Sequence, residues 1–209
     1  MLLPKYLTTL ALAASTTVMG STLPRERPAD GQYVGYINNS GQQVLEPFSG
    51  HLPSQLARIR GEDADHLSTD SVHVLEARHE PGTFQKNLMW ASNCLCGTHL
   101  DPGNTDRAVQ KLKDLCGDSC YVRDGEFVAA IDGDVIAFLC WGGGPVNSFL
   151  IAMACEATTD NCGRYVPGSV DLDTTLFRTP TIGYSKFNPG QNVCVEVTSS
   201  NLHECPKEG

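Results

Sequence analysis

The first 93 residues of this 209-residue sequence contain no cysteine, whereas the remainder contains nine. This distribution predicts an N-terminal segment without disulfides (residues 21–89), which follows a leader, and a cysteine-rich module (residues 90–209). Repeated Cys-x-x-Cys pairs and mixed Cys/His spacings are both missing, so disulfides are expected rather than a zinc site. Such a framework forms and persists in an oxidising compartment.

An odd number of cysteines leaves at least one thiol unpaired within a monomer, and the spacing does not reveal the connectivity. Only one residue separates Cys94 from Cys96, so these two are expected to bond to different partners. Cys155 and Cys162 are two helical turns apart and are expected to attach one helix to its surroundings. The disulfide candidates are Cys94, Cys96, Cys116, Cys120, Cys140, Cys155, Cys162, Cys194 and Cys205.

The sequence also lacks an apolar run long enough to span a bilayer, which takes about 20 residues. Its N-terminus carries one positive charge, Lys5, followed by an apolar stretch over residues 6–14 and then small residues up to Gly20. This pattern is typical of a secretion signal with cleavage before Ser21. We therefore expect a signal peptide (residues 1–20), a secreted, extracellular product and no membrane span.

Basic residues are few and scattered. The chain has 15 Lys and Arg against 24 Asp and Glu, which gives a formal net charge of −9. A nucleic-acid binder needs clustered cations to displace counterions from phosphates. Here only Lys111 and Lys113 lie close together. The charge pattern therefore argues against nucleic acid and anionic lipid as partners, and it favours an acidic surface that keeps a secreted protein in solution.

Common catalytic motifs are missing as well. We find no Gly-x-Ser-x-Gly, no His-Glu-x-x-His and no phosphate-binding loop with its lysine. His66 and His73 do not have the spacing of zinc ligands, so we expect no metal site and no cofactor. His99 and His203 are the only histidines of the cysteine-rich module and are the candidates for any acid–base chemistry.

The N-terminal segment contains two features of interest beside a strand pattern over residues 33–37. Asn38-Asn39-Ser40 is an N-glycosylation sequon, which requires an exposed position. Leu75-Glu76-Ala77-Arg78 resembles the Leu-x-x-Arg site at which some fungal effectors lose a pro-segment, so Arg78 is a possible processing site. Alternatively, residues 72–77 form a strand of the main sheet. The segment is thus either a pro-segment or a source of added strands.

Two helices are expected in the cysteine-rich module. The first begins at a cap on Thr105 and ends at Gly117, and the second opens at Pro145 and ends at Gly163. The first buries Ala108, Val109, Leu112, Leu115 and Cys116 on one face. The buried stripe expected on the second consists of Val146, Phe149, Leu150, Met153 and Ala157.

Two pairs of strands are expected beside these helices. Residues 126–131 and 135–141 are rich in β-forming residues, and the Asp-Gly step between them suits a tight primed turn. Residues 181–187 and 192–197 alternate well enough for two further strands. The predicted fold is an α+β sandwich in which two helices pack on an antiparallel sheet of four or five strands, with Leu112 and Phe149 in a common core.

Short local matches give a resemblance to known proteins. They are the helix end at Cys116-Gly117, the strand Val135-Ile136-Ala137-Phe138, the helix end at Cys162-Gly163 and the strand with Ile182-Gly183-Tyr184. With the order of elements, they make the module similar to small secreted cysteine-rich proteins of filamentous fungi, above all to the channel-blocking killer toxin family of smut fungi. That family is basic with an even cysteine set, whereas this module is acidic with nine cysteines, so no active residue is carried over.

The resemblance and the disulfide framework lead to an expected function. We expect a non-enzymatic, effector- or toxin-like protein that binds a protein or cell-surface component of a host or competitor. One alternative is a small secreted hydrolase that uses His99 or His203. The other is a cell-wall protein that binds glycans through Trp90, Trp141 and tyrosines, although an aromatic content of 7% argues against an extensive stacking platform.

Overall fold

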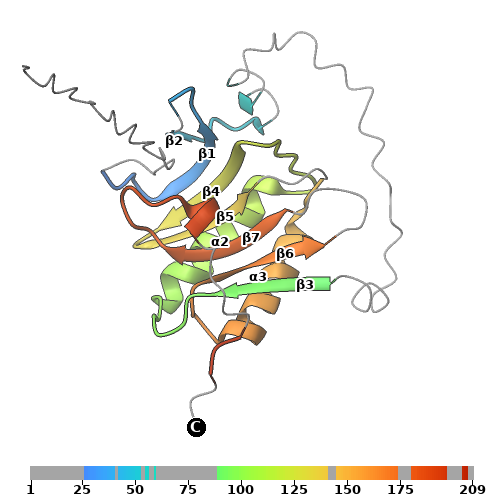
Figure 1. The fold of residues 1–209 in the computed structure, drawn as a ribbon. Helices are drawn as coiled ribbons and strands as arrows, with labels where there is room; N and C mark the ends of the chain where they lie inside the picture. The colour runs from blue at the N-terminus through green and yellow to red at the C-terminus, as the bar shows by residue number, and fades with distance from the viewer. Residues whose placement is uncertain are drawn as a thin grey trace, which may run out of the picture.

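The computed structural model describes residues 26–40, 42–52, 55, 56, 59, 89–140, 145–173, 180–196 and 204–206. Within these ranges the chain forms one seven-stranded antiparallel sheet and three helices (Figure 1). An antiparallel sheet with helices and disulfides is therefore confirmed, but the expectation of four or five strands is wrong. The expected leader, the island at 72–77 and Arg78 lie outside the described residues.

The strands follow the order β2-β1-β4-β5-β7-β6-β3 across the sheet, and all neighbouring pairs are antiparallel. Their bounds are β1 (Gly31–Ile37), β2 (Gln43–Pro47), β3 (Met89–Cys94), β4 (Glu126–Asp132), β5 (Val135–Cys140), β6 (Gly168–Asp173) and β7 (Thr181–Lys186). The edges of the sheet are β2 and β3.

Three strands, β2, β3 and β6, lie outside the strand patterns of the sequence, and two of the pairings join segments that are distant in the chain. In β1, Val34 lies opposite Val128 of β4, and β2 continues the sheet beyond β1. In β3, Ser92 lies opposite Val170 of β6. These pairings depend on hydrogen-bond partners far along the chain, which local periodicity does not reveal. Two strands of the N-terminal segment thus belong to the same sheet as the cysteine-rich module.

The β4–β5 hairpin forms the centre of the sheet. Asp132 pairs with Val135, and Gly133 in the two-residue turn has a φ of 52°, which glycine adopts without strain. Every residue of both strands is buried. The hairpin predicted from the Asp-Gly step is therefore confirmed.

The first helix of the module, α2 (Pro102–Cys116), begins four residues earlier than expected. Asp101 is its N-cap, and its carboxylate accepts a hydrogen bond from the backbone N–H of Asn104 at 2.8 Å. The predicted cap, Thr105, lies inside the helix, where its hydroxyl donates to the Asp101 carbonyl at 2.8 Å. The expected buried face is correct in its main positions, since Ala108, Leu112, Leu115 and Cys116 are buried.

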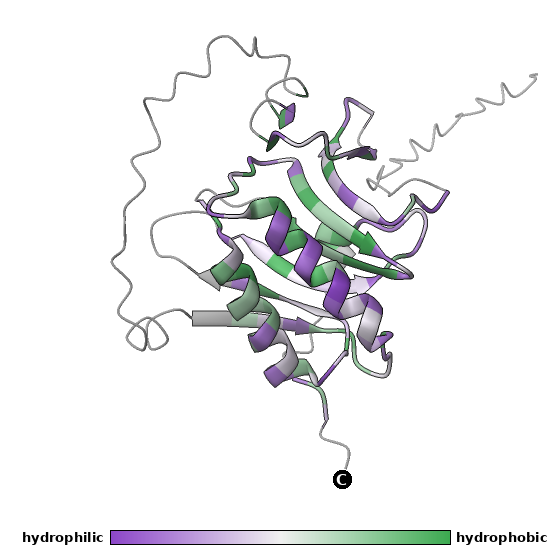
Figure 2. Cartoon of the chain, turned by 180° about the vertical axis from the view of Figure 1, so that it is seen from behind, coloured by the Kyte–Doolittle hydropathy of each residue, from purple (hydrophilic) through white to green (hydrophobic). Residues whose placement is uncertain are grey.

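The second helix, α3 (Ser148–Cys162), differs more from the prediction. Its N-cap is Asn147, and Pro145 lies outside it. Phe149 is 48% exposed, so it does not share a core with the fully buried Leu112. The residues that α3 buries are Ile151, Ala154, Cys155, Thr158 and Cys162. Residues 149–155 in the N-terminal half of α3 are all hydrophobic (Figure 2), so contact with the sheet rather than amphipathic patterning decides which face is buried.

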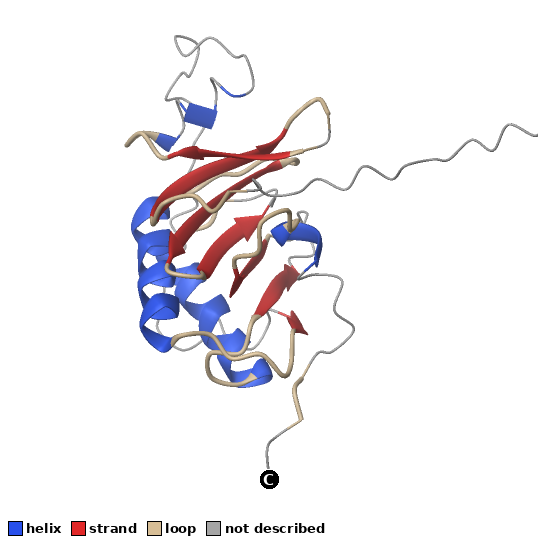
Figure 3. Ribbon diagram, turned by 90° about the vertical axis from the view of Figure 1, so that its left-hand side faces the viewer, coloured by secondary structure: helices blue, strands red, loops and turns tan. Residues whose placement is uncertain are grey.

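The two faces of the sheet are covered differently (Figure 3). Helices α2 and α3 pack on one face, where alternate residues of the central strands, such as Val128, Ala137 and Leu139, join the larger core. The opposite face carries a second core that includes Phe127 and Phe138. Gly35 lies across from Phe127 in this second core, and a Cβ at Gly35 would overlap the phenyl ring.

The short helix α4 (Val193–Glu196) closes the second core. Val193 and Cys194 are fully buried there, beside Phe187. The expectation of a strand over residues 192–197 is therefore wrong for its described part. The backbone forms a helical turn that packs on the sheet, and a disulfide from Cys194 to Cys140 of β5 holds it in place.

Candidate functional site

A groove of about 920 Å³ lies where three segments of the chain meet beside the edge strand β3. The segments are the loop after β3, the C-terminal end of α3 with its following turn, and residues 204–206. The lining residues are Cys96, Gly97, His99, Asp160, Asn161, Cys162, Gly163, Arg164, Val166, Glu204, Cys205 and Pro206. We call this the His99 groove.

Two disulfides frame the His99 groove. Cys94 of β3 is bonded to Cys162 at the end of α3, and Cys96 is bonded to Cys205. These bonds join segments 68 and 109 residues apart in sequence. The prediction that Cys94 and Cys96 bond to different partners is confirmed. The groove is therefore built on cross-linked backbone, which restricts its change of shape on binding.

Backbone hydrogen bonds fix the loop that carries His99. The N–H of Leu95 donates to the carbonyl of Pro167, and the N–H of Leu100 donates to the carbonyl of Tyr165, both at 2.9 Å. On the C-terminal side, the N–H of Cys205 donates to the carbonyl of Asn161 at 3.3 Å. The loop is thus anchored on both sides of His99.

The charged groups of the groove are of both signs. His99, Asp160, Arg164 and Glu204 are all exposed. The Arg164 guanidinium lies 5.1 Å from the centre of the Tyr165 ring and donates to its hydroxyl at 3.3 Å. His99 makes no hydrogen bond or ion pair with another described residue. This arrangement offers donors and acceptors to a ligand, and it places a histidine in the same groove as two carboxylates.

The remaining disulfides lie elsewhere. Cys116 pairs with Cys120 at the end of α2, and Cys140 pairs with Cys194. Cys155 is the free cysteine, and it is buried in α3. The expectation that both Cys155 and Cys162 attach the helix is thus correct for Cys162 alone. Burial raises the pKa of the Cys155 thiol to about 12, so it is not a reactive nucleophile in the folded chain.

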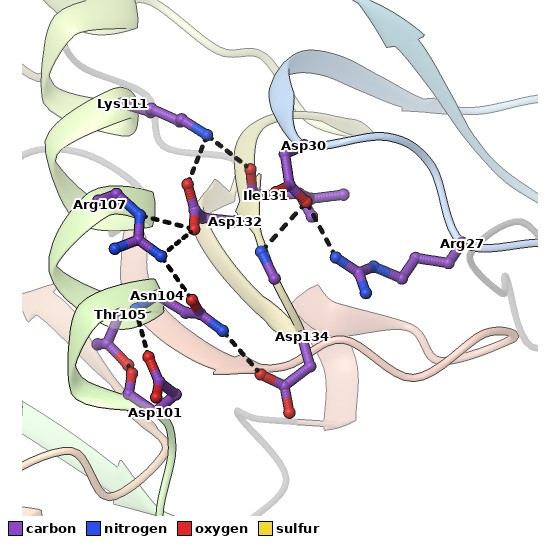
Figure 4. A network of polar contacts seen from close by, with 11 residues as sticks. Arg27, Asp30, Asp101, Asn104, Thr105, Arg107, Lys111, Ile131, Asp132 and Asp134 are labelled. Atoms are coloured by element: carbon purple, nitrogen blue, oxygen red, sulfur yellow. Dashed lines mark hydrogen bonds and ion pairs between the residues drawn. The ribbon is translucent and has the colours of Figure 1, made fainter.

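A second polar cluster connects α2, the tip of the β4–β5 hairpin and the start of β1 (Figure 4). At its centre, one carboxylate oxygen of Asp132 accepts from Arg107 Nε at 2.9 Å, and the other accepts from Lys111 Nζ at 2.7 Å. The Asp132 side chain is 8% exposed. The hydrogen bond from Arg107, followed by the bond and charge of Lys111, lowers the pKa of Asp132 despite its burial.

This cluster was not recognised in the sequence. In the sequence, Asp132 belongs to the Asp-Gly step of a predicted turn, and Arg107 and Lys111 lie on the helix predicted after Thr105. The available signal was their spacing of four residues, which places two cations on one side of a helix. Asp30 extends the cluster by accepting from the N–H of Gly133 at 3.1 Å. The hydrogen bonds of this cluster join α2, the β4–β5 turn and the residue before β1 to one another, which indicates a structural role.

Several other predicted residues lie outside the described part of the chain, namely His66, His73, His203, Trp141 and Arg78, as does the side chain of Trp90. Asn38 lies in the loop between β1 and β2. Among the described residues, no three His, Cys, Asp or Glu side chains are grouped so that they could share a metal ion.

Within the described ranges, none of the helices has the length and apolar character needed to cross a membrane. No protein-family model, no curated protein and no solved structure matches this chain.

Proposed function

We propose that this chain is a secreted, disulfide-stabilised protein that binds an extracellular target of a host or competitor organism through the His99 groove. The observation that carries the proposal is the pair of disulfides that frames a groove with charged groups of both signs. A preformed groove loses little conformational entropy on binding. Charged groups at fixed positions favour a complementary partner over others.

The proposal includes the effector- or toxin-like role that the resemblance to small fungal cysteine-rich proteins implies. Four disulfides among the described residues are consistent with an oxidising compartment outside the cell. The target is then a protein or a cell-surface component, rather than a small molecule processed within the cell.

The test is saturable binding of the labelled, secreted protein to intact plant and fungal cells. Arg164→Glu should weaken binding about tenfold or more, which corresponds to about 1.4 kcal/mol. Lys186→Glu makes the same charge reversal at an exposed residue that does not line the groove, and it should bind like the unchanged protein. Competition with purified wall polysaccharide separates a glycan target from a protein target.

Either of two results would refute the proposal. One is the lack of saturable binding to every cell type tested. The other is an equal loss of binding for Arg164→Glu and Lys186→Glu, because the His99 groove would then have no particular part in recognition.

A second candidate function is hydrolysis, which the shared groove of His99, Asp160 and Glu204 favours. In this case His99 acts as general base or acid, and Asp160 or Glu204 would come within hydrogen-bond distance of it when a substrate is bound. The test is turnover of a panel of peptide, glycoside and phosphodiester substrates. His99→Ala should abolish turnover, whereas no turnover by the unchanged protein rejects this candidate.

A further inference from the structure

The loop between β1 and β2 presents one asparagine in a defined orientation. Ile37 and Gln43 form the last pair of the β1–β2 ladder, and the N–H of Asn38 donates to the carbonyl of Gln42 at 2.9 Å. The side-chain oxygen of Asn38 accepts from the backbone N–H groups of Ser40 at 3.0 Å and Gln42 at 2.9 Å.

These two bonds assign the ends of the Asn38 amide. A backbone N–H only donates, so the atom that receives both bonds is the oxygen Oδ1. The nitrogen Nδ2 is then turned away from the loop backbone, and it makes no hydrogen bond to any described residue. Ser40 and Asn39 are exposed beside it.

Asn38 also begins the single Asn-x-Ser/Thr sequon, with x other than proline, in the 209 residues. We infer that Asn38 carries an N-linked glycan. In the modification, Nδ2 forms a bond to the anomeric carbon of a lipid-linked oligosaccharide and loses a proton, while the bond from that carbon to the lipid pyrophosphate breaks. The donor is the lipid-linked oligosaccharide of the eukaryotic secretory pathway, so the inference rests on the secretion included in the proposed function.

The surroundings of Asn38 can accommodate the first sugar. A hollow of about 340 Å³ beside the loop is lined by Tyr36, Ile37, Asn38, Asn39, Ile59, Asp124, Gly125 and Glu126. Successive side chains of a strand point to opposite faces, so residues 36 and 38 share one side. The Tyr36 ring therefore provides apolar surface on the side of Asn38, and the innermost sugar covers it. The attached sugar is therefore expected to stabilise the hairpin.

The glycan and the His99 groove do not compete for space. The β1–β2 hairpin is at one edge of the sheet, and β3, which leads into the groove, is at the other. A glycan at Asn38 therefore leaves the groove accessible to its target.

The experiment expresses the full chain in a eukaryotic secretion host and measures intact mass before and after digestion with peptide N-glycosidase, which converts a glycosylated Asn to Asp. Ser40→Ala removes the sequon hydroxyl but keeps the backbone N–H that donates to the side-chain oxygen of Asn38. This variant should therefore fold normally without the glycan. Asn38→Gln should also lack it. Asn39→Gln preserves the sequon and should remain glycosylated.

The outcomes distinguish this inference from the proposed function. If the protein is recovered from the medium with an unmodified Asn38, the inferred glycosylation is wrong but the proposed secretion stands. If it is retained in the cytosol without a glycan, both the glycosylation and the secretion are wrong. The glycosylated protein should also unfold a few degrees above its enzymatically deglycosylated form. Equal midpoints would reject the contact between the first sugar and the hollow.

Discussion

At the scale of single residues, the buried carboxylate of Asp132 joins α2 to the tip of the β4–β5 hairpin. Arg107 and Lys111 both hydrogen-bond to this carboxylate and lower its pKa below the value of an unfolded chain. A group with a depressed folded-state pKa stabilises the fold above its unfolded pKa, and this contribution is lost as the pH falls through the folded value. Asp132 should therefore stabilise the protein at neutral pH and cease to do so in acid.

Asp132→Asn tests this pH dependence. The variant keeps the size of the side chain but removes the charge, so its urea midpoint at pH 7 should be below that of the unchanged protein. The difference should shrink progressively as the pH falls below the ordinary aspartate value of about 3.9. Urea titrations at several pH values between 7 and 2 measure both effects.

The exposed Asp118 provides the control for this experiment. Asp118→Asn should leave the midpoint close to that of the unchanged protein across the same pH range. If the gap between Asp132→Asn and the unchanged protein stayed constant down to pH 2, ionisation of Asp132 would not be its cause.

At the scale of helices and strands, disulfides determine how the layers are joined. The Cys140–Cys194 bond holds α4 against the sheet face opposite α2 and α3 and links residues 54 apart in sequence. The Cys116–Cys120 bond closes a short loop, with a sequence separation of 4. A cross-link that closes a longer loop restricts the unfolded chain more, so the two bonds should differ in their contribution to stability.

Two double variants, each lacking one disulfide, should differ in their free energy of unfolding. Cys140→Ala with Cys194→Ala should lower the free energy of unfolding by about 4 kcal/mol, and Cys116→Ala with Cys120→Ala by about 2 kcal/mol, from loop-closure entropy. Each variant removes two buried sulfur atoms, which makes the pair a matched comparison. Denaturant unfolding under non-reducing conditions measures both values. A larger loss for the short loop would contradict the loop-entropy explanation.

At the scale of the whole molecule, eight of the nine cysteines form four disulfides, and the ninth is buried as a free thiol. Cys155 is buried between the layers, and burial raises the pKa of its thiol to about 12. At pH 8 the thiol stays protonated, and the thiolate is the form that reacts. The folded chain should therefore behave as if it had no free thiol.

Thiol titration with an aromatic disulfide reagent checks this prediction. The native protein should react negligibly, and the protein denatured without reductant should release one equivalent. Cys155→Ala should release none in either state. More than one equivalent from the denatured protein would show that the four disulfides are incomplete.

The local signals in the sequence were sufficient for several elements. The Asp-Gly step predicted the β4–β5 hairpin because a tight turn has strict backbone requirements. Gly117 and Gly163 marked the ends of α2 and α3 for the same reason, and both follow a helix in the structure. His99 was also identified, since it is one of two histidines in the module.

Other features depend on contacts between distant parts of the chain. The sheet has seven strands because β2, β3 and β6 join the four strands that local patterns indicate, and the exposure of Phe149 follows from the face of α3 that meets the sheet. In the sequence, Asp160, Arg164 and Glu204 are ordinary surface charges. They line one groove with His99 because two disulfides bring their segments together, and cysteine spacing does not specify which cysteines pair.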